Sequence, residues 1–498
     1  MDFFYNAPDR VVDDVIDGLA RIAPVERSVE THGVRLVLDR DRCGERVAVL
    51  SGGGAGHEPS HAGFVGRGML AGAIAGELFT SPSVEAVLAA IRATCGAAGC
   101  LLVIKNYTGD RLNFGLAAER AAREGYKVRS VIVADDVALP DASQQRGLAG
   151  TVLVHKIAGH YAAQGADLDT VADKAQRVCD SLCSLGLALS SCTLPGHEID
   201  RREPELGLGI HNEPGVRAVD PQNANAALQL VLEPLLEAFD ARFDAATPMV
   251  VLLNNLGGCS SQEMGVLMNG LLYAVPASRV ARVVTPAALM TSMDMHGFSV
   301  TLLPADEDFV TALESPVDAI GWPGLRTPGA IQTFEPMLSE HDDREPGARD
   351  STRETLIRAV VDTLVDAKHD LDALDAKVGD GDTGTTFAAG ARAVAQALDD
   401  GALSSGDDAR LAHEIGDILA RDMGGSSGVL LSILCTATGA ALADGESWSA
   451  ALRRGVARMQ HYGGAKRGDR TLLDALIPAI DALADGADLT NAAQQARA

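Results

Sequence analysis

The chain has 498 residues, of which 47% are hydrophobic and 22% are charged, a composition typical of globular proteins. This length exceeds what one hydrophobic core supports, so we expect two or three domains. The formal net charge of −26 leaves no basic surface for a phosphate backbone and argues against nucleic-acid binding.

The chain carries no evident targeting signal. Its N-terminus lacks a basic segment followed by a long apolar one, so no signal peptide is expected. We see no stretch of 18 or more apolar residues and expect no membrane span. The eight cysteines form no Cys-x-x-Cys pair and have no histidines at zinc-site spacing, which favours buried thiols in a cytoplasmic protein.

Up to about residue 325, apolar runs of strand length alternate with alanine-rich helical stretches. Continuous apolar runs predict strands of a largely buried sheet with helical crossovers. The predicted strands are Val47–Leu50, Leu101–Lys105, Val131–Ala134, Val250–Leu253, Val280–Thr285 and Ser299–Leu303. Several end in Gly, Asn or Asp, and ligands of open α/β sheets bind at such carboxyl ends. We therefore predict an α/β domain over residues 1–325, with mixed sheets and helices.

A stretch rich in Pro, Gly and charged residues follows and predicts an interdomain linker over residues 326–350. No β-branched runs follow it, so residues 351–498 are predicted to form an all-α bundle or barrel. Its first helix is expected to begin near Ser351 and to run to Lys377. Ser351 or Thr352 is the expected cap, with Glu354 at capping-box spacing from Ser351.

An acidic loop near residue 380 is the strongest single motif. Asp375, Asp380 and Asp382 lie at offsets of five and two, among glycines. Carboxylate oxygens are the ligands that Mg²⁺ prefers. The run from Thr383 to Thr386 looks like a helix start, whose free N–H groups and partial positive charge suit a phosphate. The pattern indicates nucleotide chemistry, and the alternative is an acidic turn that caps a helix.

Three polar segments of the first domain are candidates for a substrate site. A loop with four glycines leads to His57 and allows close backbone approach to a small ligand. Lys105 and Asp110 follow the second predicted strand, and His211 lies between glycines in Gly207–Gly215. The two histidines and Asp110 could form a general acid/base set around a polyol or carbonyl substrate. A loop-satisfied histidine and a helix-capping aspartate remain the alternatives.

Taken together, these stretches resemble the ATP-dependent dihydroxyacetone (glycerone) kinases, which join a substrate-binding K domain to a helical, nucleotide-binding L domain. The resemblance spans almost the whole chain in long, ordered motifs. The matching segments are Ser51–His61, Ala62–Leu70, Lys105–Phe114, Val154–Gly159, Gly207–Gly215, Asn254–Gly258, Leu374–Thr386, Met423–Gly428 and Gly468–Leu476.

For the first domain, the resemblance implies transfer of the γ-phosphate of ATP to a hydroxyl of dihydroxyacetone, with glyceraldehyde or erythrulose as further substrates. It implies that His211 binds the ketone covalently as a hemiaminal. His57 and Asp110 correspond to the pair that handles the proton of the attacking hydroxyl. The residues implied to line the substrate pocket are Gly54, Ala55, Gly56, His57, Lys105 and Asp110.

For the second domain, the resemblance implies that Asp375, Asp380 and Asp382 hold Mg²⁺ against the ATP phosphates. Positioning and charge neutralisation then carry the transfer. The implied nucleotide-binding residues are Thr383, Gly384, Thr385, Thr386, Gly425, Ser426, Ser427, Gly468 and Thr471. Without its context, the Gly-Gly-Ser-Ser-Gly run is a flexible turn. The resemblance also implies a homodimer formed through the K domain.

The chain departs from the family pattern in two places. The family motif usually reads Gly-Ile-His-Gly-Glu-Pro-Gly, whereas here Asn212 replaces the second glycine. Its side chain could reshape the pocket for a longer sugar or simply point away. Family L domains continue past Ala498 with Gly-Arg-Ala-Ser-Tyr and Asp-Pro-Gly-Ala stretches, so we expect a truncated L domain with weakened ATP binding or stability.

Two further functions therefore stay open beside the kinase. One is a ketose-binding or regulatory homologue that transfers phosphate poorly. The other is an additional FAD-AMP lyase activity that forms a cyclic flavin phosphate, as in some relatives.

Overall fold

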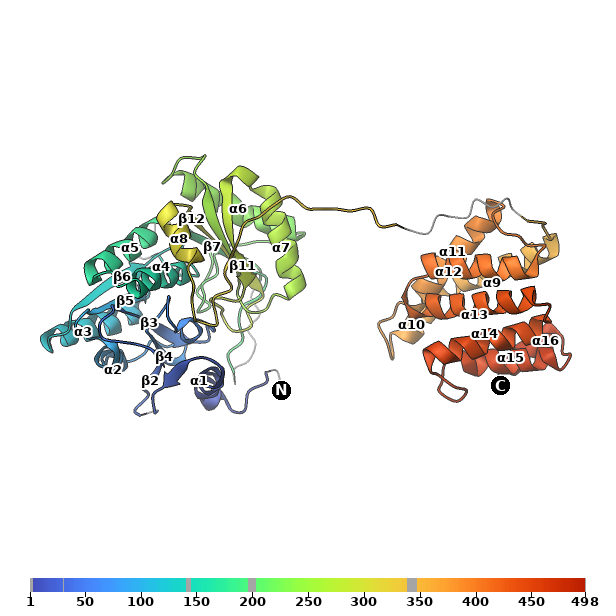
Figure 1. Cartoon of the computed structure of the whole chain (residues 1–498), viewed down its shortest axis with the longest axis horizontal. Coiled ribbons are helices and arrows are strands. Elements are labelled where there is room, and N and C mark those ends of the chain that lie inside the picture. Colours follow the sequence, from blue (N-terminus) through green and yellow to red (C-terminus); the bar gives the residue numbers. More distant parts are fainter. Residues whose placement is uncertain (1–2, 30, 140–144, 196–202, 338–346, 498) are drawn as a thin grey trace. The chain divides into compact units, whose positions relative to one another are not determined.

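The computed structural model of the chain describes residues 3–29, 31–139, 145–195, 203–337 and 347–497. The chain divides into two compact units, residues 1–333 and 334–498 (Figure 1). The predicted linker at 326–350 spans this division, and its residues 338–346 lie outside the described residues. The first unit is mixed α/β and the second is helical, which confirms the predicted fold class.

One mixed sheet of the first unit has six strands in the order β1-β2-β4-β3-β5-β6. Strands β4, β3, β5 and β6 pair in parallel, and β1 and β2 are antiparallel additions at one edge. The strands are β1 (Val25–Arg27), β2 (Arg35–Asp39), β3 (Ala48–Ala55), β4 (Gly72–Leu78), β5 (Cys100–Lys105) and β6 (Val128–Val133). The first three strands predicted from the sequence correspond to β3, β5 and β6.

The second sheet has seven strands in the order β13-β11-β10-β12-β7-β8-β9. Only β10 and β11 pair in parallel among these strands, and the other pairs are antiparallel. The strands are β7 (Cys183–Ala188), β8 (Glu205–Leu206), β9 (Arg217–Ala218), β10 (Met249–Asn255), β11 (Val280–Ala287), β12 (Gly297–Pro304) and β13 (Leu325–Arg326). The remaining three predicted strands are β10, β11 and β12.

Helices surround these sheets (Figure 1). They are α1 (Val11–Ile22), α2 (Val84–Thr94), α3 (Thr108–Arg123), α4 (Thr151–Ala163), α5 (Leu168–Ser181), α6 (Ala224–Asp240), α7 (Ser261–Ala274) and α8 (Glu307–Glu314), with short 3₁₀ turns at Pro8–Arg10, Ala62–Phe64 and Ala277–Arg279. Helix α4 is buried along almost its whole length against β3, β5 and α8. Its sequence is apolar nearly all round, as expected for a core helix.

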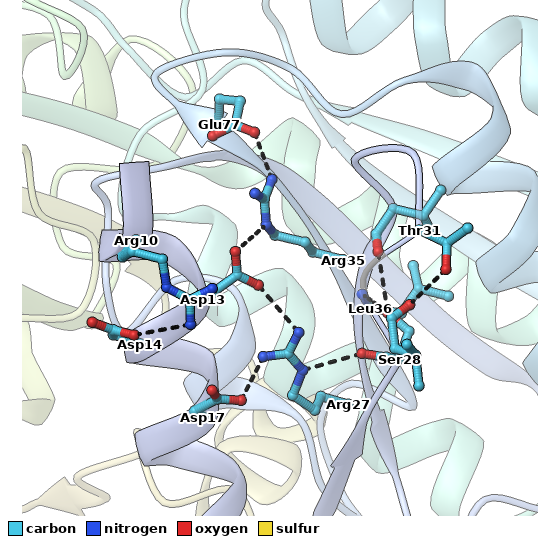
Figure 2. Close-up of polar contacts among 12 residues, drawn as sticks. Arg10, Asp13, Asp14, Asp17, Arg27, Ser28, Thr31, Arg35, Leu36 and Glu77 are labelled. Carbon is cyan, nitrogen blue, oxygen red and sulfur yellow. Dashed lines mark hydrogen bonds and ion pairs between the residues drawn. The ribbon is translucent and has the colours of Figure 1, made fainter. Parts of the chain in front are cut away.

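An ion-pair network centred on two buried residues, Asp13 and Arg35, fastens α1 to the six-stranded sheet (Figure 2). Asp13 of α1 accepts from Arg27 Nη2 at 3.1 Å and from Arg35 Nε at 3.2 Å. Arg35 also donates to Glu77 of β4 at 2.6 Å, and Arg27 donates to Asp17. Asp13 and Arg35 are buried, so removing the carboxylate would leave a guanidinium with fewer partners in a dry site.

The second unit is a bundle of helices. They are α9 (Ser351–Asp366), α10 (Lys368–Asp375), α11 (Thr383–Asp399), α12 (Asp408–Asp422), α13 (Gly425–Ala443), α14 (Trp448–Gly463), α15 (Leu473–Ala484) and α16 (Leu489–Arg497). One small core lies among α9, α11 and α12, and another among α13, α14 and α15.

The predicted first helix of this unit is corrected in two respects. It is two helices, because the helical conformation is interrupted at Ala367, between α9 and α10. The cap is Asp350, not Ser351 or Thr352, since the Asp350 carboxylate accepts from the backbone N–H groups of residues 352 and 353. Glu354 does not complete a capping box, because its carboxylate binds Arg349 and the Ser405 hydroxyl.

Helix α13 is the one helix among the described residues that is long and apolar enough to cross a membrane, with a mean hydropathy of 1.6. This property follows from length and composition alone, and core helices of helical bundles share it. Figure 1 shows α13 between α12 and α14, its main packing partners. The sequence reading overlooked it because Ser, Thr and Gly interrupt its apolar residues.

Candidate active site

His57 follows β3, and its imidazole is fully buried. Its Nδ1 lies 2.7 Å from the Thr291 carbonyl oxygen, a contact that requires the proton on Nδ1. Burial, followed by the charges of Lys105 and His211, holds the pKa of His57 well below its usual value. The ring is therefore neutral, and Nε2 presents a lone pair to the site.

His211 lies in the turn between β8 and β9, and its Nε2 is 3.0 Å from His57 Nε2. Glu213 accepts from the His211 backbone N–H at 3.0 Å and lies 3.3 Å from His211 Nδ1. Burial raises the pKa of Glu213, but hydrogen bonds and charge from His211 outweigh it and lower that pKa to about 2. The Glu213 carboxylate thus orients His211 with its proton on Nδ1 and its Nε2 toward His57.

The facing histidine nitrogens have a chemical consequence. Both Nδ1 atoms carry protons to oxygen acceptors, so two neutral rings would direct Nε2 lone pairs at each other across 3.0 Å. This repulsion is relieved if the two Nε2 atoms share one proton. It is also relieved if a polar atom of a ligand lies between them. An arrangement of this kind can act as a nucleophile beside an acid/base group.

Aromatic rings enclose His211. Tyr107 meets it edge-on with centroids 4.5 Å apart, and Phe79 does so at 5.4 Å. Phe79 also stacks on His57 at 5.1 Å. Tyr107 lies inside a motif singled out from the sequence, but nothing near Phe79 marked it as part of the site. These rings cover His211 in part, and its side chain stays 19% exposed.

Lys105 and Asp110 converge beside Gly53. A Cβ built on Gly53 would lie 3.1 Å from Lys105 Nζ and 3.6 Å from Asp110 Oδ2. Asp110 is in the first turn of α3 and does not cap it, since the cap position is Tyr107. Burial lowers the pKa of Lys105, and the carboxylate of Asp110 opposes that shift. The Lys105 amine and the Asp110 carboxylate thus lie together beside Gly53, near the end of β3.

Several buried polar atoms around this site have no hydrogen-bond partner within the described part of the chain. They are Ser81 Oγ, Lys105 Nζ, Tyr107 OH and Arg146 Nη1. Unpaired buried donors are costly, and a polar ligand that pairs with them recovers that cost. The geometry therefore suits a small ligand rich in hydroxyl or carbonyl oxygens.

The predicted pocket residues Gly54, Ala55 and Gly56 serve backbone packing in the structure. A Cβ on Gly54 would lie 2.6 Å from the Thr80 nitrogen, and Ala55 O accepts from Phe79 N at 2.9 Å. Gly56 has φ +98°, and a Cβ there would lie 2.7 Å from the Phe79 ring. These small residues let the segment around Phe79 cross the end of β3 and reach the histidines.

In the helical unit, ligand oxygens of Asp375, Asp380 and Asp382 lie within 4.8 Å of one another. Asp375 Oδ2 accepts from three consecutive backbone N–H groups, at Gly381, Asp382 and Thr383, which fixes the loop. The charge of Asp380 raises the pKa of Asp382, a repulsion that a divalent cation would relieve. An all-oxygen set of this kind fits Mg²⁺.

Helices α11 and α13 of this unit contact each other, and both begin without a side-chain cap. Helix α11 begins at Thr383 and α13 at Gly425, and neither cap residue bonds the helix through its side chain. Met423 packs against both helices. A Cβ built on Gly390 of α11 would lie 3.0 Å from Met423 Cβ, and one built on Gly428 of α13 would lie 2.9 Å from it. The free N–H groups at the start of α13, around Ser426 and Ser427, suit phosphate oxygens.

Some predicted nucleotide-binding groups already have protein partners. Asp372, which the sequence reading did not single out, accepts from both Thr385 N and Thr385 Oγ1. Asp474 accepts from the N–H groups of Gly468 and Thr471. These bonds hold the loops before α11 and α15.

Comparison with known proteins identifies the two units. Residues 17–321 match the Dak1 domain family, and residues 377–498 match the DAK2 domain family. Dihydroxyacetone kinase of Citrobacter freundii is 46% identical over an alignment of 493 residues, which covers 97% of this chain and 88% of that protein. The chain belongs to the dihydroxyacetone kinase family. The family resemblance inferred from the sequence is thereby confirmed.

Other members of the family agree. The Bos taurus protein named triokinase/FMN cyclase is 39% identical and is matched over 95% of this chain and 85% of its own. The crystal structure of the C. freundii dihydroxyacetone kinase in complex with AMP-PNP and Mg²⁺ has a TM-score of 0.81 and 44% identity, covering 100% of this chain and 93% of that one. The expected activity, an ATP-dependent glycerone kinase, fits these relatives.

Asn212, the departure from the dihydroxyacetone kinase motif, has a structural explanation. Its φ is +63°, the left-handed region that glycine adopts freely and that asparagine tolerates better than most residues. Its side chain accepts from Cys192 N at 3.2 Å and donates to Cys192 O at 3.3 Å. These bonds use the side chain to support the turn, a role that neither alternative drawn from the sequence named.

Proposed function

We propose that this protein transfers the γ-phosphate of ATP to a hydroxyl of dihydroxyacetone while His211 holds the ketone as a covalent hemiaminal. The observation that carries the proposal is the His57–His211 contact, in which Glu213 fixes the Nδ1 proton of the nucleophile. Kinase relatives with the same two domains support the choice of phosphate donor and acceptor.

The covalent step follows from the positions of these groups. The lone pair of His211 Nε2 attacks the carbonyl carbon, an N–C bond forms, and the C=O π bond breaks toward oxygen. The neutral His57 takes up one proton from solvent at Nε2 and passes it to that oxygen, which makes a hydroxyl and leaves His57 neutral. The His211 ring gains positive charge, which Glu213 stabilises at Nδ1. Glycerol has no carbonyl and cannot be held in this way.

The transfer step needs a base for the attacking hydroxyl. We assign this proton to the Asp110 carboxylate or His57, with Lys105 beside them to balance charge. In the helical unit, Asp375, Asp380 and Asp382 would hold Mg²⁺, which neutralises the phosphate charge when bound. The reaction requires the nucleotide and the ketose to meet, within one chain or between subunits of a homodimer.

Two measurements test the proposal. Intact-protein mass spectrometry with dihydroxyacetone should show a gain equal to the whole ketose, because addition loses no water, and His211→Ala should abolish it. A coupled ADP-release assay with Mg²⁺ should report turnover with dihydroxyacetone and, to different extents, glyceraldehyde and erythrulose, but none with glycerol. An adduct without turnover would instead indicate the ketose-binding, regulatory alternative. Turnover that survives His211→Ala would refute the covalent anchor.

A second activity has a narrower basis. The relatives named triokinase/FMN cyclase motivate a test for cleavage of FAD to a cyclic flavin phosphate. We propose it as an additional reaction of the nucleotide site. Asp380→Asn should raise the Mg²⁺ concentration that it needs, together with that of the kinase reaction, whereas His211→Ala should remove the kinase reaction alone. Absence of a cyclic product from the wild-type protein would exclude it.

A further inference from the structure

Cys259, Glu263 and His296 form a second cluster of potential metal ligands, in the first unit. The sulfur, a carboxylate oxygen and an imidazole nitrogen all lie within 4.8 Å of one another. His296 Nε2 lies 2.6 Å from Glu263 Oε1. None of the three belongs to the kinase site described above.

The fold holds these side chains in place from separate elements. Cys259 lies in the loop after β10, Glu263 in the first turn of α7 and His296 directly before β12. Asn255 donates to Cys259 O at 2.7 Å and accepts from Cys259 N at 3.2 Å, which fixes the cysteine backbone. Glu263 Oε2 accepts from Ser260 N at 2.7 Å, which anchors that carboxylate. The cluster is thus organised before any ion binds.

The donor set distinguishes between metals. Thiolate, imidazole and carboxylate together suit Zn²⁺ and similar borderline ions, whereas Mg²⁺ and Ca²⁺ take oxygen ligands. Tetrahedral bonds of about 2.0–2.3 Å place ligand atoms roughly 3.3–3.7 Å apart. The observed cluster needs shifts of about 1 Å to reach this geometry, with the His296–Glu263 contact widening and the thiol moving inward.

A hollow next to the cluster leaves room for a further ligand. It has a volume of about 350 Å³, and all three residues line it together with apolar side chains such as Leu187, Val266 and Phe298. Three protein ligands beside a hollow resemble zinc sites that keep one position for water.

We propose that Cys259, Glu263 and His296 bind one divalent ion of the Zn²⁺ class, with the fourth position left to water. On binding, the Cys259 thiol gives up its hydrogen bond to the Gly297 carbonyl oxygen, loses its proton to solvent and bonds the metal, which ties the start of α7 to the residue before β12. The site is separate from the all-oxygen aspartate cluster of the helical unit, so Mg²⁺ does not compete for it.

Metal titration of the full chain tests the site. After chelation and dialysis, excess Mg²⁺ is added to occupy the aspartate cluster, and Zn²⁺ binding is measured by calorimetry. We expect one equivalent of Zn²⁺, with affinity lowered at least about 100-fold in Cys259→Ser and His296→Gln. Cys435→Ser, which changes another half-buried thiol, is the matched control and should bind as the wild type does.

Cobalt provides a readout that does not depend on the variants folding. Co²⁺ bound to the wild-type chain should give a thiolate-to-cobalt charge-transfer band and the intense visible bands of a tetrahedral ion. The proposal is overturned if wild-type protein shows no thiolate band, or if Zn²⁺ binds equally well to the folded Cys259→Ser variant. Thermal melts of metal-free variants establish that they are folded.

Discussion

Replacing Glu213 by glutamine should separate the orientation of His211 from the rest of the site. Both Glu213 oxygens accept hydrogen bonds from His211, one from the backbone N–H at 3.0 Å and one from Nδ1 at 3.3 Å. A glutamine has one oxygen and one NH₂, so one His211 donor would face another donor. Losing a bond to a charged acceptor costs about 1.5–3 kcal/mol. Because the Glu213 side chain is 34% exposed, we expect about 1.5 kcal/mol, or roughly a tenfold loss in kcat/KM.

The assay is initial-rate ADP release at saturating ATP and Mg²⁺, with the dihydroxyacetone adduct measured in parallel by mass spectrometry. Both readouts should fall together in Glu213→Gln, because the carboxylate acts through the nucleophile. Glu205→Gln is the matched control, since Glu205 accepts from Gly215 N at 2.7 Å and bonds the same turn without contacting the His211 ring. Wild-type adduct formation in Glu213→Gln, or an equal loss in Glu205→Gln, would refute the reasoning.

The other predictions concern the metal loop, the turn, the ion-pair network and pH. Asp380→Asn should raise the Mg²⁺ concentration needed for half-maximal rate about tenfold or more, while the amount of dihydroxyacetone adduct stays as in the wild type. An unchanged Mg²⁺ dependence would contradict the metal site. Asn212→Gly should change the free energy of unfolding by less than about 1 kcal/mol, since glycine suits φ +63°. It should leave the ratio of the rates with erythrulose and dihydroxyacetone unaltered. A shifted ratio would mean that the Asn212 side chain shapes the pocket. Asp13→Ala should lower the free energy of unfolding, measured in urea, by about 3 kcal/mol. Asp14→Ala removes a more exposed ion pair and should lower it by less than about 1 kcal/mol. Equal effects of the two substitutions would argue against a buried network. The pKa of Glu213 is about 2 in the folded protein against an ordinary value of 4.5. Its stabilising contribution is therefore complete above pH 4.5 and is lost as the pH falls toward 2. In urea unfolding, the free energy of unfolding should fall less on acidification in Glu213→Gln than in the wild type.

The sequence predicted strands that contain an unbroken apolar run. The start of β3 and most of β5 and of β10 are such runs and needed no knowledge of neighbours. β4 and β7 were missed because glycine interrupts their apolar residues. The break between α9 and α10 carries no glycine or proline, so nothing local announced it.

The candidate site was only partly predictable for a related reason. His57, Asp110 and His211 stood out because glycine-rich or polar motifs surround them. The ring of Phe79 and the carbonyl of Thr291 come from segments with no motif, and only the folded chain brings them to the histidines. The Glu263–His296 contact spans 33 positions, so no local spacing rule for metal ligands could have found it.

The hydrogen bond from His57 to Thr291 joins residues 234 positions apart, and the His57–His211 contact spans 154. Closing such long loops is slow and entropically costly, so these contacts are expected to form late in folding. During refolding, secondary structure should return before the proposed ability to trap a ketone. Formation of the proposed adduct would therefore be a stringent reporter of completed topology in the first unit, independent of the helical unit.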